Sequence, residues 1–436
     1  MRGTISIPIK KVARFADQLC RWSQNERYAL VLRSNSDMLT CDAYTPHSRY
    51  EVLAAFGAES LVVPGKNCFD ELREATAQND WLFGYLGYDL KNEVERLTSN
   101  NSDGLHFPEM LFFRPSVVFA VQDGVVSIHY SQAKYNRQTA GSLFDAIMDK
   151  PAVAAPNDKD IITRVRFTKD EYFDTVNRVL SHIHRGDIYE MNLCQEFYAQ
   201  SCRINPYETY LRLNQLSPTP FSAFGKFHDK FLLCASPERY LQKQGNRVIS
   251  QPIKGTCPRG KNAQEDSQLA DKLRNDPKER AENIMIVDLV RNDLSRVAQR
   301  ASVTVDELCG VYHFPQVHQL ISTVSCNLNA NYDIVDLLKA TFPMGSMTGA
   351  PKVSAMQIAE QVERTKRGLY SGTVGYIDPL GNADFNVVIR SLLYNKSKRY
   401  LSYSVGGAIT SKSNPEQEYS ECLLKAMAIE NVLTTS

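Results

Sequence analysis

The chain has 436 residues, 43% of them hydrophobic and 23% charged, so it can bury the core of one large domain or two ordinary ones. Its formal net charge of +1 gives no reason to expect a nucleic acid or an anionic membrane as a partner. The N-terminus lacks a signal-peptide pattern, no apolar run reaches membrane-span length, and the ten cysteines include no CxxC pair, so we expect a cytoplasmic protein with reduced thiols.

The first third of the chain is predicted to be mostly β. A helix is expected near Lys10–Ser23. Strand-like runs separated by turn residues follow it: Tyr28–Leu32, Leu61–Val63, Met110–Phe113, Ser116–Val121 and Val125–Tyr130. Residues 150–160, KPAVAAPNDKD, lose hydrophobic periodicity and predict a boundary between residues 1–150 and residues 161–436.

After this boundary, helices and strands alternate irregularly. Helical patterns cover Asp170–Arg185, Ala263–Val297 with a break near Asn275–Pro277, and the stretches 333–341, 351–364 and 415–433. Strands are expected at 231–235, 247–253, 320–328, 373–378, 385–394 and 400–405. There is no regular βαβ period and no GxGxxG after a strand, so the sequence favours an α+β fold with antiparallel or mixed sheets.

The segment PIKGTCPRG, residues 252–260, holds a lysine in a stiff loop. Two prolines bracket it, Gly255 permits close backbone approach, and Thr256 offers a hydroxyl. Desolvation on such a loop would lower the pKa of Lys254 and free its amine as a nucleophile. The alternative is a surface lysine in a proline-rich turn, and the segment alone favours that alternative.

Three glutamates predict oxygen ligands for a hard cation. Glu282 lies on the helix that carries Ile284, Met285, Val287 and Leu289, and Glu418 and Glu421 share one face of a later helix with Lys425. Carboxylates from separate helices suit Mg²⁺. An ordinary solvated acidic face near a helix N-terminus is the alternative.

Two loops contain small residues suited to close contact with a ligand. GSMTGAPK, residues 345–352, brings Thr348 and Gly349 to the start of a helix, where free N–H groups can receive an anion. VGGAIT, residues 405–410, precedes the helix of Glu418 and Glu421. Each loop alone is also consistent with a tight turn.

In chain order, these segments resemble the chorismate-utilising enzymes. This family includes the large subunits of anthranilate and aminodeoxychorismate synthases and the isochorismate and salicylate synthases. The resemblance runs from about Phe167 to the end, whereas residues 1–150 match the N-terminal domain of the large amidating subunits only loosely. It is carried by GDIYEMNL, ASPERY, PIKGTCPRG, AENIMIVDLVRNDLSRVA, LISTVS, GSMTGAPK, RGLYSGTVGYID, VVIRS and EQEYSE. It implies β-sheets packed as a sandwich with flanking helices.

The resemblance assigns roles to the candidate residues. Glu238 matches the general acid that protonates the departing C4 hydroxyl of chorismate. Mg²⁺ would be bound by Glu282, Glu418 and Glu421. The expected substrate-binding residues are Gly406, Gly407 and Lys425 for the ring carboxylate, Tyr370 and Arg390 for the enolpyruvyl carboxylate, and Thr256, Thr348 and Gly349.

Lys254 selects among the reactions of this family. Members that aminate chorismate at C4 carry PIKGT, whereas those that form anthranilate carry PIAGT. The lysine is taken to attack C2 as C4 loses water, and ammonia then adds at C4. Isochorismate and salicylate synthases have a base lysine at the position of Glu190, so the resemblance favours 4-amino-4-deoxychorismate as product, with anthranilate formation as the alternative.

Several positions depart from the family pattern. Amidating members usually have Gln where Glu190 stands, and the histidine before the LxST strand is replaced by Gln319, with His318 one place earlier. Ser34 lies near the place of the LLES signature of tryptophan-inhibited members, which is not evident, so tryptophan inhibition is not expected. A glutaminase GxCxG segment is also missing, so ammonia should come from a separate glutamine amidotransferase subunit. A non-catalytic regulatory subunit is the reading from a different functional class.

Overall fold

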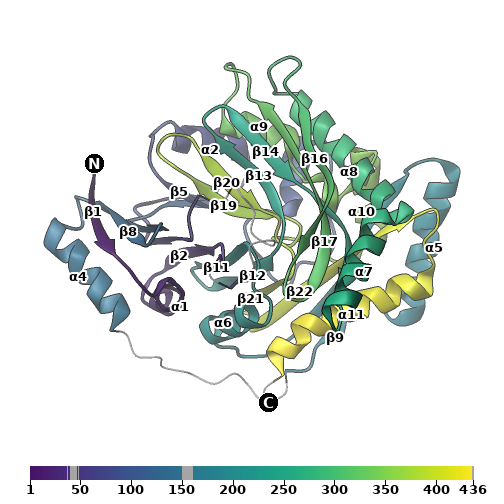
Figure 1. Ribbon diagram of the computed structural model, residues 1–436, viewed down its shortest axis with the longest axis horizontal. Helices are drawn as coiled ribbons and strands as arrows, with labels where there is room; N and C mark the ends of the chain where they lie inside the picture. Colours follow the sequence, from purple (N-terminus) through teal and green to yellow (C-terminus); the bar gives the residue numbers. More distant parts are fainter. Residues whose placement is uncertain (37, 40–46, 48, 150–160, 435–436) are drawn as a thin grey trace.

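The computed structural model describes residues 1–36, 38–39, 47, 49–149 and 161–434, so the expected boundary at 150–160 lies outside the described residues. Figure 1 shows two large β-sheets that pack together and are flanked by helices. Every strand pairing within the two sheets is antiparallel across the described ranges. The α+β class with antiparallel sheets is therefore confirmed.

The two sheets contain twelve and ten strands within the described residues. The first has the order β1 (Arg2–Pro8), β8 (Val125–Ser131), β7 (Val117–Gln122), β3 (Val52–Phe56), β2 (Tyr28–Arg33), β11 (Phe221–Phe227), β12 (Lys230–Ser236), β21 (Ser391–Asn395), β22 (Tyr400–Thr410), β10 (Glu190–Ala199) and β18 (Gly349–Ala350), with β9 (Arg164–Val165) beside β10. The second has the order β15 (Ile253–Pro258), β17 (Val317–Asn327), β14 (Arg247–Gln251), β13 (Arg239–Gln244), β20 (Ala383–Asn386), β19 (Thr373–Ile377), β5 (Leu82–Leu86), β6 (Met110–Arg114) and β4 (Ser60–Val62), with β16 (Thr304–His313) beside β17.

Strands from before and after residues 150–160 pair in both sheets. In the twelve-stranded sheet β2 pairs with β11, and in the ten-stranded sheet β5 pairs with β19. Backbone hydrogen bonding is thus continuous across the two chain segments. The division into a domain of residues 1–150 and a domain of residues 161–436 stays a prediction.

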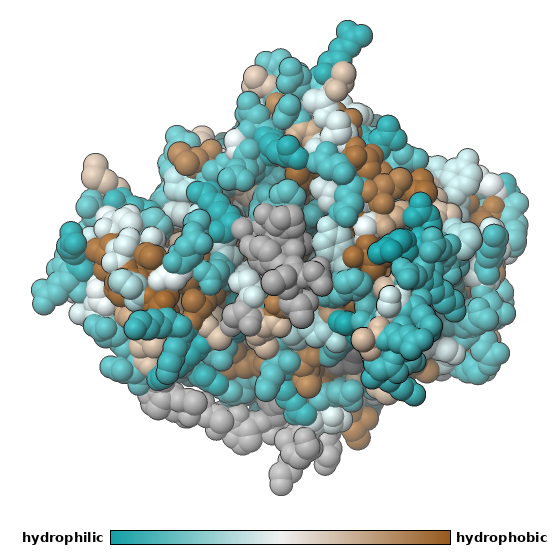
Figure 2. Space-filling view, in the orientation of Figure 1, coloured by the Kyte–Doolittle hydropathy of each residue, from teal (hydrophilic) through white to brown (hydrophobic). Residues whose placement is uncertain are grey.

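Two hydrophobic cores follow from the alternation of side chains along the strands. In β2, Leu30 belongs to the core shared by both sheets, whereas Ala29 and Val31 belong to the core beneath the helices. The first core also takes in residues of α2 (Cys68–Thr76), α8 (Pro277–Ser295) and α9 (Ile334–Thr341). Hydrophilic residues predominate on the molecular face in Figure 2, with hydrophobic ones in separate patches.

The helices of the second core cover the outer face of the twelve-stranded sheet. They are α1 (Val12–Trp22), α4 (Arg137–Met148), α5 (Lys169–Arg185), α6 (Pro206–Leu216), α10 (Lys352–Val362) and α11 (Pro415–Leu433). In the ten-stranded sheet, β15, β16 and β17 are contacted by α7 (Ala263–Asn275), and the short α3 spans Lys91–Val94. No helix in the described ranges is long and apolar enough to cross a membrane.

Most of the expected elements are present, with bounds that differ by a few residues. The predicted break of the long helical region is confirmed: Asp276 caps α8 through its side chain and Pro277 starts it. The expected single strand 385–394 is wrong. Residues between β20 and β21 leave the ladder, because Val387 and Val388 donate to the carbonyls of Glu238 and Gly372 and Arg390 has a φ of +50°.

Candidate active site

Lys254 lies in a β-bulge of β15. The pairing of β15 with β17 shifts register between Ile253 and Thr256. Gly255 has a φ of +94°, and a Cβ there would come within 3.0 Å of Leu320 and 3.1 Å of Glu279. A bulge re-aims the side chains beside it, and the sequence Lys-Gly allows this one. From α8, Asn283 donates to the Lys254 carbonyl at 3.2 Å, which fixes the backbone of the bulge.

The amine of Lys254 crosses from one sheet to the other. Its Nζ lies 3.0 Å from Oε1 of Glu190, the first residue of β10 in the twelve-stranded sheet. The side chains of Lys254 and Glu190 are 12% and 1% exposed, so this ion pair is largely shielded from water. The second oxygen of Glu190 is buried and has no hydrogen-bond partner among the described residues.

The environment of Lys254 corrects one expectation from the sequence. Burial alone would lower the pKa of Lys254, as predicted, but the neighbouring carboxylates of Glu190, Glu282 and Glu238 outweigh burial and raise the pKa above its ordinary value. Lys254 is therefore an ammonium ion in this state. It needs a proton acceptor before it can act as a nucleophile.

Glu238 lies in the turn between β12 and β13, and its side chain belongs to the same group of charges. Burial raises the pKa of Glu238 to about 7, although the positive charges of Lys254 and Arg390 oppose the shift. Burial also lowers the pKa of Arg390 to about 10, against the influence of Glu238. Within the described chain, no ion pair engages the Arg390 guanidinium. The two groups suit a proton donor and a receptor for an incoming carboxylate.

The three glutamates predicted to bind metal come from α8 and α11. Glu282 and Glu418 are buried, whereas the Glu421 side chain is 53% exposed and pairs with Lys425 at 2.7 Å. Nζ of Lys278, one turn before Glu282, lies 3.8 Å from the Glu282 carboxylate. The pKa of Lys278 is raised because the charges of Glu282, Glu418 and Glu421 outweigh the effect of burial, so one ammonium ion is close enough to feel all three carboxylates.

These residues suit a hard cation, although their side chains are not gathered around one point. Among the described residues, no three His, Cys, Asp or Glu side chains are close enough together to bind a metal ion. However, Oε1 of Glu282 is buried without a hydrogen-bond partner, and burial raises the pKa of Glu282 to about 7. A divalent ion would relieve both conditions. The set therefore fits Mg²⁺, and its role in binding stays a prediction.

The glycines of the VGGAIT segment lie within β22, which extends to Thr410 rather than ending near residue 405. A Cβ on Gly406 would come within 2.6 Å of the Asn192 side-chain amide, so a larger residue here would require Asn192 to move. The Lys425 ammonium donates to the Gly406 carbonyl at 3.1 Å. At Gly407, a Cβ would lie 3.5 Å from the Glu418 carboxylate. The structure therefore brings Gly406, Gly407, Lys425 and Glu418 together.

The GSMTGAPK loop lies beside Glu190. Gly349 pairs with Met191, and a Cβ on Gly349 would lie only 2.2 Å from the Glu190 carbonyl. Thr348 is buried, and its hydroxyl donates to the Gly345 carbonyl at 3.2 Å. Tyr370 is also buried, and burial raises its pKa well above the usual range. Their predicted contacts with a substrate are not tested by this geometry.

Gln319 and His318 are adjacent in β17, and their side chains contact different partners. Gln319 pairs with Thr256 across β17 and β15, and its Nε2 lies 3.5 Å from the Thr256 hydroxyl. Its Oε1 is buried without a hydrogen-bond partner. By contrast, Nε2 of His318 contacts Asp266 of α7 at 2.9 Å. Gln319 therefore lies on the Thr256 side, and by the resemblance it stands in place of a histidine.

Three residues of this region were not among the predicted site residues. Glu190 had been noted only as a departure from the family pattern, and nothing in the sequence indicated its contact with Lys254. Lys278 could have been found, because a lysine four residues before Glu282 shares its helix face. Asn283 carried no sequence signal for its bond to the Lys254 carbonyl.

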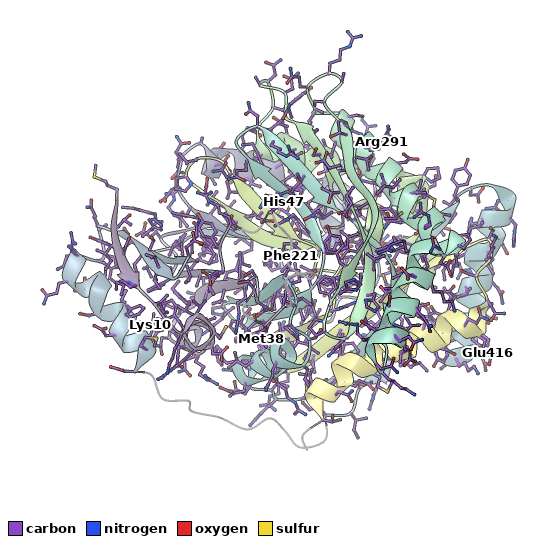
Figure 3. All side chains as sticks on the ribbon, viewed as in Figure 1. Lys10, Met38, His47, Phe221, Arg291 and Glu416 are labelled. Carbon is purple, nitrogen blue, oxygen red and sulfur yellow. The ribbon has the colours of Figure 1, made fainter. Side chains whose placement is uncertain are left out.

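A cavity apart from this group lies between the two sheets. It has a volume of about 60 Å³, and Ser34, Arg49, Phe221 and Asp384 are among the residues that line it. Figure 3 labels Phe221 near the centre of the molecule and Glu416 at the N-terminal end of α11. None of the predicted catalytic or metal-binding residues lines the cavity. The structure alone does not test whether tryptophan binds, so the expectation that tryptophan does not inhibit the protein stays a prediction.

Comparisons with known proteins agree with the resemblance of the motifs. Residues 44–431 match the family model described as chorismate binding enzyme. The chain is 37% identical over 351 residues to an aminodeoxychorismate synthase component 1 from Salmonella typhimurium, covering 79% of this chain and 75% of that protein. It is 35% identical over 353 residues to an anthranilate synthase component 1 from Thermus thermophilus, covering 79% and 76%.

Solved structures show the same architecture. The crystal structure of anthranilate synthase component I from Streptococcus pneumoniae superposes with a TM-score of 0.75 at 25% sequence identity, covering 88% of this chain and 93% of that one. The relatives thus carry the names of two different synthases at nearly equal identity. Overall similarity does not decide between them, and the choice falls to individual residues.

Proposed function

Since the chain belongs to the chorismate binding enzyme family, we propose that it is the synthase component of aminodeoxychorismate formation and replaces the C4 hydroxyl of chorismate with an amine from ammonia. The observation that carries this proposal is the place of Lys254. Its amine is shielded between the two sheets, in contact with one carboxylate and under the influence of Glu238. By the resemblance, anthranilate-forming members have alanine at this position and no such amine.

The residues suggest a two-step substitution. Nζ of Lys254, as a neutral amine, attacks C2 of chorismate, both conjugated ring double bonds shift by one position, and the bond from C4 to its hydroxyl breaks. Glu238 donates the proton that lets the hydroxyl leave as water, and a pKa of about 7 suits a donor at neutral pH. Ammonia then attacks C4, both double bonds return to their original positions, and the bond between C2 and Lys254 breaks. The ammonium formed at C4 returns a proton to Glu238. The products are 4-amino-4-deoxychorismate and water.

Gln319 supports retention of the enolpyruvyl group. Formation of anthranilate requires loss of pyruvate, for which the family histidine is the expected assistant. Here a neutral amide faces Thr256, and the adjacent His318 contacts Asp266 instead. A side-chain amide does not ionise near neutral pH, so it cannot act as a general acid or base. This arrangement favours amination without loss of pyruvate.

Mg²⁺ is part of the proposal, with Glu282, Glu418 and Glu421 as its ligands. Chorismate is a dianion, and carboxylates alone would repel it. A bound Mg²⁺ would supply the positive charge that receives the ring carboxylate, together with Lys425 and the backbone at Gly406 and Gly407. Arg390 would take the enolpyruvyl carboxylate in a fork, with Tyr370 beside it.

Ammonia is expected from a separate glutamine amidotransferase subunit, because the sequence contains no glutaminase motif of its own. Free ammonium should replace this partner in vitro. The requirement makes the synthase reaction testable with the chain alone.

Product identification tests the proposal. The purified chain is incubated with chorismate, Mg²⁺ and ammonium, and the mixture is divided with and without an added aminodeoxychorismate lyase. We expect p-aminobenzoate only in the portion with lyase. Direct appearance of anthranilate would favour anthranilate synthase, the second candidate, and absence of chorismate and Mg²⁺ binding in calorimetry would favour a non-catalytic subunit.

A further inference from the structure

The ion pair of Lys254 and Glu190 joins two residues that are 64 positions apart in the sequence and belong to different sheets. The proposed reaction uses Lys254 and leaves Glu190 without a task. Glu190 is nevertheless almost completely buried, and only one of its oxygens has a partner in the described chain. Burying a carboxylate oxygen without a hydrogen-bond partner costs free energy, so a residue that keeps one is a candidate for a functional role.

The reaction has an unmet proton requirement at Lys254. An ammonium ion has no lone pair, so it cannot attack C2 before it loses a proton. Water is a poor acceptor here, because the side chain is only 12% exposed. Glu238 must itself be protonated to donate to the leaving hydroxyl. Glu282 makes no ion pair with Lys254 and is occupied when Mg²⁺ binds.

We propose that Glu190 is a catalytic residue that accepts the proton of Lys254 and later returns it, an inference that rests on the proposed C4 amination. A proton moves along the existing hydrogen bond from Nζ to Oε1, two atoms 3.0 Å apart, which leaves a neutral amine and a carboxylic acid. The amine forms its bond to C2 while Glu238 protonates the leaving hydroxyl. When ammonia expels the lysine, the neutral amine recovers its proton from Glu190, so the pair ends as it began.

This role predicts a specific dependence on pH. The ion pair and the neutral pair contain the same number of protons, so the reactive fraction of Lys254 does not change with pH while the pair holds one proton. Without the Glu190 carboxylate, Lys254 must release its proton to water, and the reactive fraction rises about tenfold per pH unit below the pKa of Lys254. The other carboxyl groups whose charges act on Lys254 come from the β12–β13 turn, α8 and α11: Glu238, Glu282 and Glu421.

The first experiment measures the charge of Lys254 without any turnover. The wild type and Glu190→Gln are labelled with acetic anhydride over a range of pH, and modification of the Lys254 peptide is followed by mass spectrometry. We expect the midpoint for Lys254 to fall by about one pH unit or more in Glu190→Gln. Glu279→Gln removes a nearby carboxylate that makes no ion pair with Lys254 and should shift the midpoint far less. An unchanged midpoint in Glu190→Gln overturns the proposal, whatever reaction the protein performs.

The second experiment uses single-turnover amination at saturating ammonia and chorismate. Because Glu238 and the substrates titrate alike in both proteins, the ratio of the Glu190→Gln rate to the wild-type rate isolates Lys254. This ratio should rise about tenfold per pH unit through the neutral range. A ratio independent of pH would mean that Glu190 has only a structural role.

Glu190→Asp keeps a carboxylate and provides the conservative comparison, including the case in which Glu190→Gln does not fold. Its rate should be lower because the shorter side chain lengthens the contact, yet its ratio to the wild-type rate should not vary with pH. A ratio that rises with pH for the aspartate variant contradicts the proposal. If the wild type forms no 4-amino-4-deoxychorismate, the proposed function fails, and the labelling experiment still decides whether Glu190 controls the proton of Lys254.

Discussion

The carboxyl groups around Lys254 differ in their contacts and in their pKa values, and these differences define the chemistry of the site. Glu190 contacts the amine and keeps it charged. Glu238 is buried with a pKa near 7, so it is partly protonated under the conditions in which Lys254 is fully protonated. Environments that push two groups apart in this way are typical of acid and base pairs in active sites. At the residue scale, the geometry supports Glu238 as a proton donor and Lys254 as a nucleophile that must first lose a proton.

The first prediction concerns the pH dependence of amination. Glu238 must be protonated to act, and its pKa is raised to about 7, so the wild-type rate at saturating ammonia should fall by about tenfold per pH unit above 7. Glu238→Gln should reduce the rate by about 10²–10⁴-fold and lose this dependence. Single-turnover rates of the wild type and Glu238→Gln, measured between about pH 6 and about pH 9, check both expectations. A glutamine variant with near wild-type activity would exclude Glu238 as the acid.

The second prediction concerns stability. The pKa of Glu238 is about 7 in the folded chain against an ordinary value of 4.5, so the folded protein holds this proton more tightly than the unfolded chain does. The wild type should lose up to about 3 kcal/mol of unfolding free energy as the pH rises from below 4.5 to above 7. Glu238→Gln avoids this loss. Its Tm should exceed that of the wild type at pH values above about 7 and match it in acid; equal Tm values at alkaline pH would contradict the burial of an ionising group.

The third prediction concerns Arg390. A lysine there cannot bind a carboxylate in a fork, so Arg390→Lys should raise KM for chorismate by about 10–100-fold, with a smaller effect on kcat. Arg399→Lys is a matched control, because Arg399 has the same φ of +50° but is exposed. Steady-state kinetics of both variants provide the measurement. Equal KM values in the two would remove Arg390 from the substrate site.

Sequence reasoning at this scale found the individual groups better than their partners. Lys254 and Glu238 were named from the motifs, and the structure places their charges within reach of one another. The expected lowering of the Lys254 pKa was wrong, because the effect of burial could be anticipated from the loop but the contact with Glu190 could not. That contact depends on how two sheets pack, and no local pattern reports it.

At the scale of elements, the bulge of β15 determines where Lys254 points. The register shift around Gly255 turns the lysine toward β10, and Asn283 of α8 holds the carbonyl of the same residue. A regular strand would alternate its side chains and place Lys254 differently. The bulge is therefore as important for the proposed chemistry as the lysine itself.

The fourth prediction tests this bulge. Gly255→Ala introduces a Cβ at φ +94°, a strained conformation for alanine, and this Cβ meets the ends of the Leu320 and Glu279 side chains at 3.0–3.1 Å. Either these side chains or the backbone of the bulge must move. We expect amination to fall by at least about tenfold, since small displacements of a nucleophile are costly. Gly245→Ala also places alanine at positive φ, but with no atom within 4 Å of the new Cβ. This control should lose about 1 kcal/mol of unfolding free energy and keep its activity; equal activity losses would mean that backbone strain alone is responsible.

The prediction of helices and strands succeeded where the residues that begin and end an element lie next to each other in the sequence. The pair Asp276 and Pro277 divides α7 from α8, and both residues act within one turn. It failed between β20 and β21, where Val387 and Val388 look like a strand but bond to Glu238 and Gly372. Their partners lie in distant segments, so the sequence pattern could not distinguish them from a ladder.

At the scale of the whole molecule, the site depends on the packing of the two sheets against each other. Lys254 belongs to the ten-stranded sheet, Glu190 to the twelve-stranded one, and both sheets contain strands from before and after residues 150–160. The α+β class was predictable from the spacing of helices and strands. The order of the strands was not, because pairs such as β5 with β19 join segments that are far apart in the sequence and lie on opposite sides of residues 150–160.

Mass spectrometry of the Lys254 peptide after rapid quenching tests the covalent mechanism most directly. The chain is mixed with chorismate and Mg²⁺, and ammonium is then added to one portion. We predict that Lys254 gains the mass of chorismate less water, that ammonium removes this adduct as 4-amino-4-deoxychorismate forms, and that Lys254→Ala shows neither event. Unmodified Lys254 throughout turnover, together with amination by Lys254→Ala at the wild-type rate, would contradict the covalent mechanism.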